Sequence, residues 1–121
     1  MDIRPLPYQF TVCKLKSSSD IRTDKEFYFA SVTDEEISLV CKTSDVPDNT
    51  SERDDGWKAF RIEGILDFSL IGILSEISSV LAENRIGIFA VSTYNTDYIL
   101  VKEGNFEKAL KALGNKGFRI I

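Results

Sequence analysis

The spacing of apolar residues between positions 70 and 81 most constrains how this chain can fold. These residues stand three or four positions apart: Leu70, Ile73, Leu74, Ile77, Val80 and Leu81. Such spacing predicts an amphipathic helix with one buried face, which a second layer must cover. Ser69 directly precedes the pattern and is the expected N-cap, since its hydroxyl could accept a first-turn N–H. Asn84 and Gly87 are expected to end the helix.

Segments rich in β-branched and aromatic residues flank this helix and predict strands. The expected strands cover residues 57–63, 88–94, 98–102 and 118–121. A second helix is expected to bury Phe106, Ala109, Leu110 and Leu113, to start at Asn105, and to end at Gly114 or Gly117. The order strand–helix–strand–strand–helix–strand predicts an α+β, ferredoxin-like fold, with two helices on one face of a four-stranded antiparallel sheet.

The first half of the chain is less regular. Strands are expected over residues 10–16, 27–33 and 37–42, and no helical period of useful length accompanies them. We therefore expect two domains: a reduced, mostly β lobe over residues 1–56 and the complete α+β domain over 57–121. The polar, turn-rich stretch 43–56 is expected to connect the lobes, or alternatively to form a lid over a ligand.

Composition argues for binding rather than catalysis. The 121 residues contain no histidine, which removes the usual acid–base residue near neutral pH and most metal sites, so no metal or cofactor is expected. The net charge of −4 provides no basic field for nucleic acid or a membrane surface. Cys13 and Cys41 lie in apolar segments without metal spacing and are expected to be reduced and buried. The first residues lack the apolar region of a secretory signal, so a cytoplasmic location is expected.

One candidate binding segment is the junction that leads into the first helix, Phe68, Ser69, Leu70, Ile71 and Gly72. The first turn of a helix presents unpaired backbone N–H groups, on which a carboxylate or phosphate can dock. Gly72 would allow close approach because it has no Cβ. The alternative is an ordinary helix cap with a packing glycine.

The second candidate segment is the expected hairpin turn between the central strands. Polar side chains gather there, and the candidate ligand-binding residues are Thr93, Asn95, Thr96 and Asp97. Their hydroxyl and amide groups could hydrogen-bond a small polar ligand, and Asp97 could pair with an ammonium group. The alternative is that such residues are simply what hairpin turns contain.

Three stretches carry a family resemblance: DFSLIGILSEISSVLAE, GIFAVSTYNTDYILV and FEKALKALGNKGF. They resemble the compact two-lobed ACT proteins, which are related to the regulatory regions of aspartate kinases and to cytosolic arginine sensors. FYFASVTDEEISLVCK resembles the first, reduced lobe more loosely. The resemblance implies paired ACT lobes that hold amino acids at lobe or subunit interfaces and regulate without chemistry of their own. An acidic hairpin residue of the arginine sensors resembles Asp97. ACT domains commonly begin the first helix with an acidic residue and Pro-Gly, and here only Gly72 matches that pattern.

These observations lead to a function hypothesis with three alternatives. We expect a non-catalytic amino-acid sensor that forms a homodimer and regulates an unidentified partner protein in trans. A vestigial ACT pair that serves only for assembly is the main alternative. An enzyme would depend on Cys13, Cys41, Glu35 or Glu36, which show no catalytic arrangement. An RNA-binding domain would need a basic face with exposed aromatic residues, which the composition does not provide.

Overall fold

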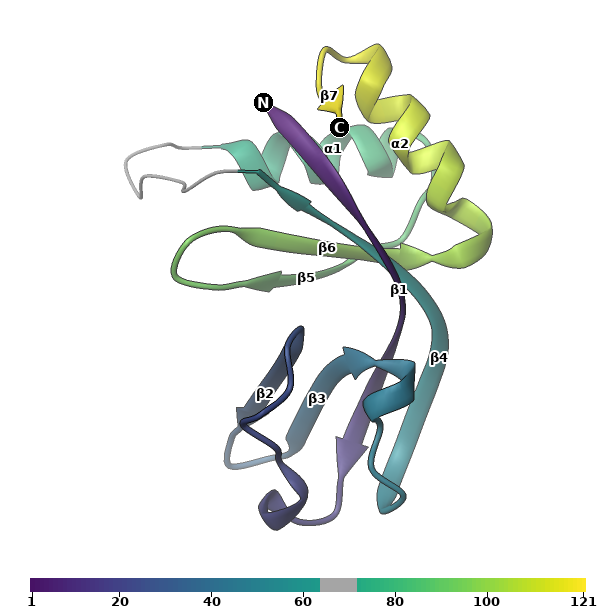
Figure 1. Cartoon of the computed structure of the whole chain (residues 1–121). Helices are drawn as coiled ribbons and strands as arrows, with labels where there is room; N and C mark the ends of the chain where they lie inside the picture. The colour runs from purple at the N-terminus through teal and green to yellow at the C-terminus, as the bar shows by residue number, and fades with distance from the viewer. Residues whose placement is uncertain (64–71) are drawn as a thin grey trace. The chain divides into compact units, whose positions relative to one another are not determined.

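The computed structural model describes residues 1–63 and 72–121 and shows an α+β fold. The chain forms two compact units. We call residues 1–7 with 58–121 the helical unit, and residues 8–57 the strand unit. Strands β1 (Asp2–Leu15) and β4 (Thr50–Ile62) are long, and each contributes residues to both units (Figure 1).

The helical unit confirms the order of elements expected for the second half of the chain. After β4 come α1 (Ile73–Glu83), β5 (Phe89–Ser92), β6 (Asp97–Lys102), the short 3-10 turn η3 (Glu103–Asn105), α2 (Phe106–Asn115) and β7 (Arg119–Ile120). In the sheet, β6 lies between β4 and β5. Strands β5 and β6 are antiparallel, and Ser92 pairs with Asp97 at the end next to the turn.

Both helices bury their apolar faces in one core of the helical unit. The buried helix residues are Ile77, Val80, Leu81, Phe106, Ala109, Ala112 and Leu113. They pack with the strand residues Ile3, Phe60, Ile62, Ile99 and Val101. Because alternate strand residues point to opposite faces, the strand residues of this core all belong to one face of the sheet. The helices therefore cover that face, as the sequence predicts.

The last strand is placed differently from the expectation of a simple four-stranded sheet. β7 pairs in parallel with the start of β1, where Asp2 pairs with Arg119 and Ile3 with Ile120. The Arg119 guanidinium also holds the Asp2 carboxylate through two contacts of 3.0 and 2.6 Å. β1 in turn lies next to β4, so the chain's first strand lies between β4 and β7. Local sequence patterns do not encode this long-range pairing.

The first helix begins later than predicted. α1 starts at Ile73, and Gly72 occupies the N-cap position with a φ of 88°. That backbone angle lies in the left-handed region, which glycine adopts without the steric cost that other residues bear. Gly72 therefore precedes the first turn instead of lying within it. Ser69, the expected N-cap, lies outside the described residues.

Both helices end in the same capping motif. After α1, the N–H of Ile86 bonds to the Leu81 carbonyl and the N–H of Arg85 bonds to the Ala82 carbonyl, each at 2.9 Å. This pair of bonds defines a Schellman motif, whose central residue adopts a left-handed backbone. Asn84 caps α1 as predicted, but Arg85, not Gly87, has the positive φ of 59°.

The α2 terminus has glycine at the same place in its motif. The N–H of Phe118 bonds to the Leu113 carbonyl at 3.1 Å, and Gly117 has a φ of 100°. Of the two predicted ends, Gly114 lies within the helix and Gly117 follows it. Asn105 occupies the N-cap position of α2 as expected, although its side chain makes no capping hydrogen bond.

The strand unit contains β2 (Tyr28–Val32), β3 (Ile37–Lys42) and parts of β1 and β4, in the order β2-β3-β1-β4. Its short 3-10 turns are η1 (Ser18–Asp20) and η2 (Thr43–Asp45). The second half of the expected connector is instead the beginning of β4. Residues 51–55 are exposed there, which explains why their polar sequence indicated a loop.

The two cysteines are unbonded and buried, as predicted. They pack with Leu15 and Leu39 in a small core of the strand unit. Burial raises the pKa of the Cys41 thiol to about 12, with a smaller contribution from the neighbouring Cys13. Burial also raises the pKa of Cys13. Among the described residues, no helix is long and apolar enough to cross a membrane.

Candidate functional site

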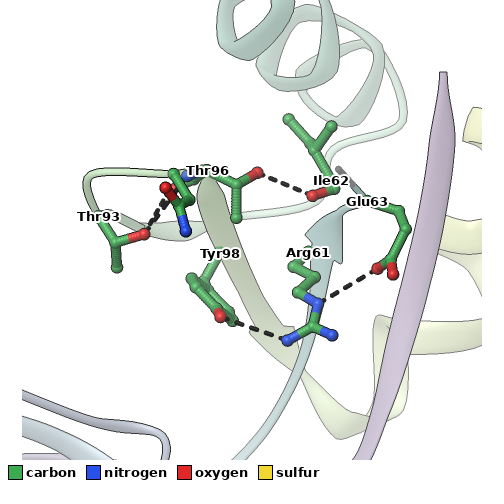
Figure 2. A pocket seen from close by; sticks show the side chains of 7 residues that line it. Arg61, Ile62, Glu63, Thr93, Thr96 and Tyr98 are labelled. Carbon is green, nitrogen blue, oxygen red and sulfur yellow. Dashed lines mark hydrogen bonds and ion pairs between the residues drawn. The ribbon is translucent and has the colours of Figure 1, made fainter. Parts of the chain in front are cut away.

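A polar pocket of about 230 Å³ lies in the helical unit, between the end of β4 and the β5–β6 hairpin (Figure 2). It is lined by Arg61, Ile62, Glu63, Thr93, Asn95, Thr96 and Tyr98. This volume is below the roughly 300–1,000 Å³ typical of pockets for drug-sized ligands. The pocket therefore suits a molecule of the size of a single amino acid.

Thr96 fixes the hairpin against the end of β4. Its buried hydroxyl donates a 2.8 Å hydrogen bond to the Ile62 carbonyl (Figure 2). Within the turn, the N–H and the hydroxyl of Thr93 both donate to the Thr96 carbonyl, at 2.8 and 3.0 Å. These bonds close the turn over residues 93–96, so Asp97 is the first residue of β6 rather than part of the turn. The strand end that leads toward α1 and the hairpin turn consequently lie at the same end of the sheet.

Three further side chains form one side of the pocket. Arg61 lies near the end of β4, and Glu63 directly follows the strand. Because they stand two residues apart in an extended segment, they point to the same side, opposite Phe60 and Ile62. The Nε of Arg61 lies 3.3 Å from the Glu63 carboxylate, and its Nη1 lies 3.4 Å from the Tyr98 hydroxyl (Figure 2). A guanidinium, a carboxylate and a phenol thus meet on the face of the sheet that the helices leave uncovered.

Electrostatics keep both charged side chains of the pocket ionised. The hydrogen bond to Tyr98, followed by that to Glu63, raises the pKa of Arg61. Desolvation alone would raise the pKa of Glu63, but the hydrogen bonds and charges of Arg61 and Arg4 lower it overall. The Nε of Arg4 lies 3.1 Å from the Glu63 carboxylate. One carboxylate is therefore shared between two guanidinium groups.

The structure brings together part of the residue set predicted from sequence. Thr93, Asn95 and Thr96 line the pocket. Asp97 does not line it, because its carboxylate accepts a 2.5 Å hydrogen bond from the Ser92 hydroxyl across the hairpin. Gly72 is not among the lining residues either. The remaining members, Phe68, Ser69, Leu70 and Ile71, lie outside the described residues.

Sequence reasoning missed Arg61, Glu63 and Tyr98. Arg61 and Glu63 alternate with buried apolar residues in a strand, which is the ordinary pattern of a half-buried sheet and gives no sign of a site. The available signal was an Arg-x-Glu spacing at a strand end, next to a polar hairpin. This spacing indicates a site only when the β5–β6 hairpin turn lies next to the end of β4.

A second polar hollow, of about 400 Å³, lies in the strand unit. It is lined by Ser19, Asp20, Arg22, Lys25, Ser44, Asp45, Val46, Pro47 and Asp48. Its two cations are already engaged, Arg22 with Asp24 at 2.7 Å and Lys25 with Asp45 at 3.7 Å. The hollow therefore offers no distinctive binding chemistry.

Comparison with known proteins places the chain in a family. The ACT domain family matches residues 52–115, which is more than half of the chain. A solved structure of an Agrobacterium tumefaciens protein is similar with a TM-score of 0.86 and 31% identity, covering 99% of this chain and 91% of that one. No curated protein matches the sequence.

More distant structures share the fold. An aspartate kinase from Clostridium acetobutylicum, described as an allosteric enzyme, matches with a TM-score of 0.64 and 16% identity, over 89% of this chain and 32% of that one. An aspartokinase of alpha and beta subunits matches with a TM-score of 0.65 and 15% identity, over 95% of this chain and 96% of that one. The class is thus an α+β fold that also occurs in aspartate kinases. The chain belongs to the ACT domain family.

Proposed function

We propose that this chain is a non-catalytic regulatory module that binds a free amino acid and acts on a partner protein in trans. The single observation that carries the proposal is the pocket of the helical unit, where Arg61 and Glu63 present opposite charges within about 230 Å³. A free amino acid also carries both charges on a small skeleton, so the pocket can match it in size and in chemistry. Membership of the ACT family and the fold shared with an allosteric aspartate kinase support a regulatory role.

The neutral lining residues supply the remaining contacts that an amino acid needs. The hydroxyl of Thr93 and the amide of Asn95 lie at the rim, where both side chains are exposed. The amide of Asn95 can donate to a carboxylate or accept from an ammonium group. The Thr93 hydroxyl, which donates to the Thr96 carbonyl, can still accept from an ammonium group. The contacts of such a ligand would thus combine one ionic contact with several neutral hydrogen bonds.

A thermal-shift panel of the twenty amino acids tests this proposal on the full chain. A ligand at 100 times its Kd stabilises a protein by about 2.7 kcal/mol. For a domain of this size, the melting temperature should then rise by several degrees. At least one amino acid should produce this rise in the wild type. No rise with any of them at millimolar concentration would contradict the proposal.

Assembly without ligand binding is the competing function. The strand path of the described sheet ends in β2 and β5, and such edge strands can pair with another chain. We therefore expect a homodimer, which light scattering after size-exclusion chromatography can measure. A stable dimer that shows no thermal shift with any amino acid would favour the assembly function.

A further inference from the structure

The charges around the pocket of the helical unit do not balance. Arg61 and Glu63 line the pocket, and Arg4 binds Glu63 as a second cation at 3.1 Å. No other charged side chain of the described residues lines it. The lining charges of Arg61 and Glu63 cancel, and Arg4, which contacts Glu63 from outside the lining, adds one positive charge to this group. The Glu63 carboxylate is thereby compensated from two sides. Such a site favours a ligand with an additional negative charge.

The contacts of Arg61 leave its guanidinium able to bind an anion. A guanidinium has five N–H donors in a planar fork. Its Nε and Nη1 make contacts of 3.3 and 3.4 Å, at the long end of the hydrogen-bond range. The Arg119–Asp2 pair, by comparison, has contacts of 3.0 and 2.6 Å. In the part of the chain that the structure describes, Nη2 of Arg61 makes no hydrogen bond. A ligand carboxylate could take both Nη groups in the bidentate geometry that arginine prefers.

A ligand with a basic side chain would meet the opposite situation. The charge that could receive its second ammonium group is Glu63, which is held between Arg4 and Arg61. Asp97 bonds to Ser92 and does not line the pocket. A basic ligand would have to displace a guanidinium from Glu63 before it could form its own ion pair. It would also add a cation to a site that already has a positive excess.

We infer that the pocket selects an acidic amino acid, the aspartate or glutamate class, over neutral and basic ones. The inference rests on the proposed function and specifies the ligand of the same pocket. The side-chain carboxylate of the ligand binds Arg61, while its α-ammonium group is received by neutral oxygens such as those of Thr93 and Asn95. Loss of one charge-assisted hydrogen bond weakens binding by about 10- to 100-fold, so an acid should bind that much more tightly than its amide.

Calorimetric titration of the full chain with L-aspartate, L-asparagine, L-glutamate, L-glutamine and L-lysine tests this inference. At least one acid should bind at least 10-fold more tightly than its amide, and lysine should bind more weakly than that acid. An amide that binds as tightly as its acid, or lysine as the tightest ligand, would overturn the charge selectivity while the proposed function stands. No thermal shift with any of the twenty amino acids would instead contradict the proposed function itself.

Variants of Arg61 separate the site from general charge effects. R61Q should reduce the preference for the acid to less than about 3-fold, and R61K, which keeps the charge, should retain part of it. R22Q removes the same charge in the strand unit, where Arg22 pairs with exposed Asp24, and should leave the preference unchanged. If R61Q and R22Q lost the preference for the acid to the same extent, the assignment of Arg61 as the anion-binding residue would be contradicted. If R61Q is unstable, R61K takes its place, and a melting curve shows that R61K is folded.

Discussion

The hydroxyl of Thr96, the last residue of the hairpin turn before β6, donates a 2.8 Å hydrogen bond to the carbonyl of Ile62, at the end of β4. This bond joins two segments that are 34 residues apart in the chain. It places the hairpin turn over the strand end from which Arg61 and Glu63 project. The pocket thus depends on a contact that contributes nothing to ligand chemistry but determines where the polar groups lie.

Replacing Thr96 by valine should destabilise the protein by about 1–3 kcal/mol. The change keeps the shape of the side chain but leaves the Ile62 carbonyl without its buried donor, and an unsatisfied buried group costs about that much. Urea unfolding measures the difference. T96S retains the hydroxyl, so its free energy of unfolding should fall by less than that of T96V. A T96V variant as stable as the wild type would show that the bond has no net effect on folding.

Replacing Arg85 by glycine should stabilise the protein by about 1 kcal/mol. Arg85 adopts a φ of 59°, and a left-handed backbone costs a residue with a Cβ roughly 1–2 kcal/mol. Part of this gain is offset because glycine is more flexible in the unfolded chain. Gly117 holds the same position after α2, so G117A should have the opposite effect. Thermal unfolding measures both variants, and a lower melting temperature for R85G would contradict this account of the α1 terminus.

The stability of the protein should fall with rising pH between about 8.5 and 12, partly because of Cys41. Burial raises the pKa of its thiol to about 12, whereas an unfolded thiol titrates near 8.5. The unfolded state therefore releases a proton first, and the contribution to stability is lost as the pH rises through this window. Unfolding free energies at pH 8 and pH 10.5 should differ less in C41A than in the wild type. If the difference between the two pH values were the same in C41A and in the wild type, the Cys41 thiol would titrate alike in the folded and unfolded states.

The pairing of Asp2 with Arg119 should stabilise the protein at neutral pH and lose this effect in acid. The hydrogen bond from Arg119 lowers the pKa of Asp2 below its usual value of 3.8. The contribution is present above that value and disappears as the pH falls through the lowered pKa. D2N should therefore unfold at lower urea than the wild type at pH 7, and the two should converge near pH 2. A constant difference at both pH values would point to a loss that does not involve this charge.

The elements of the second half of the chain could be predicted because each has a strong local pattern. The apolar face around Ile77 and Leu81 has helical spacing, and the predicted strand at 98–102 combines apolar and β-branched residues. Local patterns failed where tertiary structure decides the outcome. Residues 51–55 belong to strand β4 and are exposed, although their polar side chains are typical of a loop. The parallel pairing of Ile3 with Ile120 joins opposite ends of the chain, and no local sequence pattern in either segment predicts it.

The candidate site was predictable only in part, for the same reason. Thr93, Asn95 and Thr96 attracted attention because they lie in a turn dense with polar groups. Arg61 and Tyr98 lie in strands that also contribute to the core, where a polar residue on alternate positions is the normal pattern. Their proximity depends on which strands are neighbours, and sequence periodicity carries no information on strand order. The role of Asp97 in ligand binding stays a prediction.

The most direct test of the central claim is to map amino-acid binding by the chemical shifts of backbone amides in the full chain. On titration with L-aspartate, the account predicts saturable shifts that centre on Glu63, Thr93, Asn95 and Tyr98 and that disappear in R61Q. Shifts that centre on residues 19–48 of the strand unit, or no saturable shifts with aspartate or any other amino acid, would contradict it.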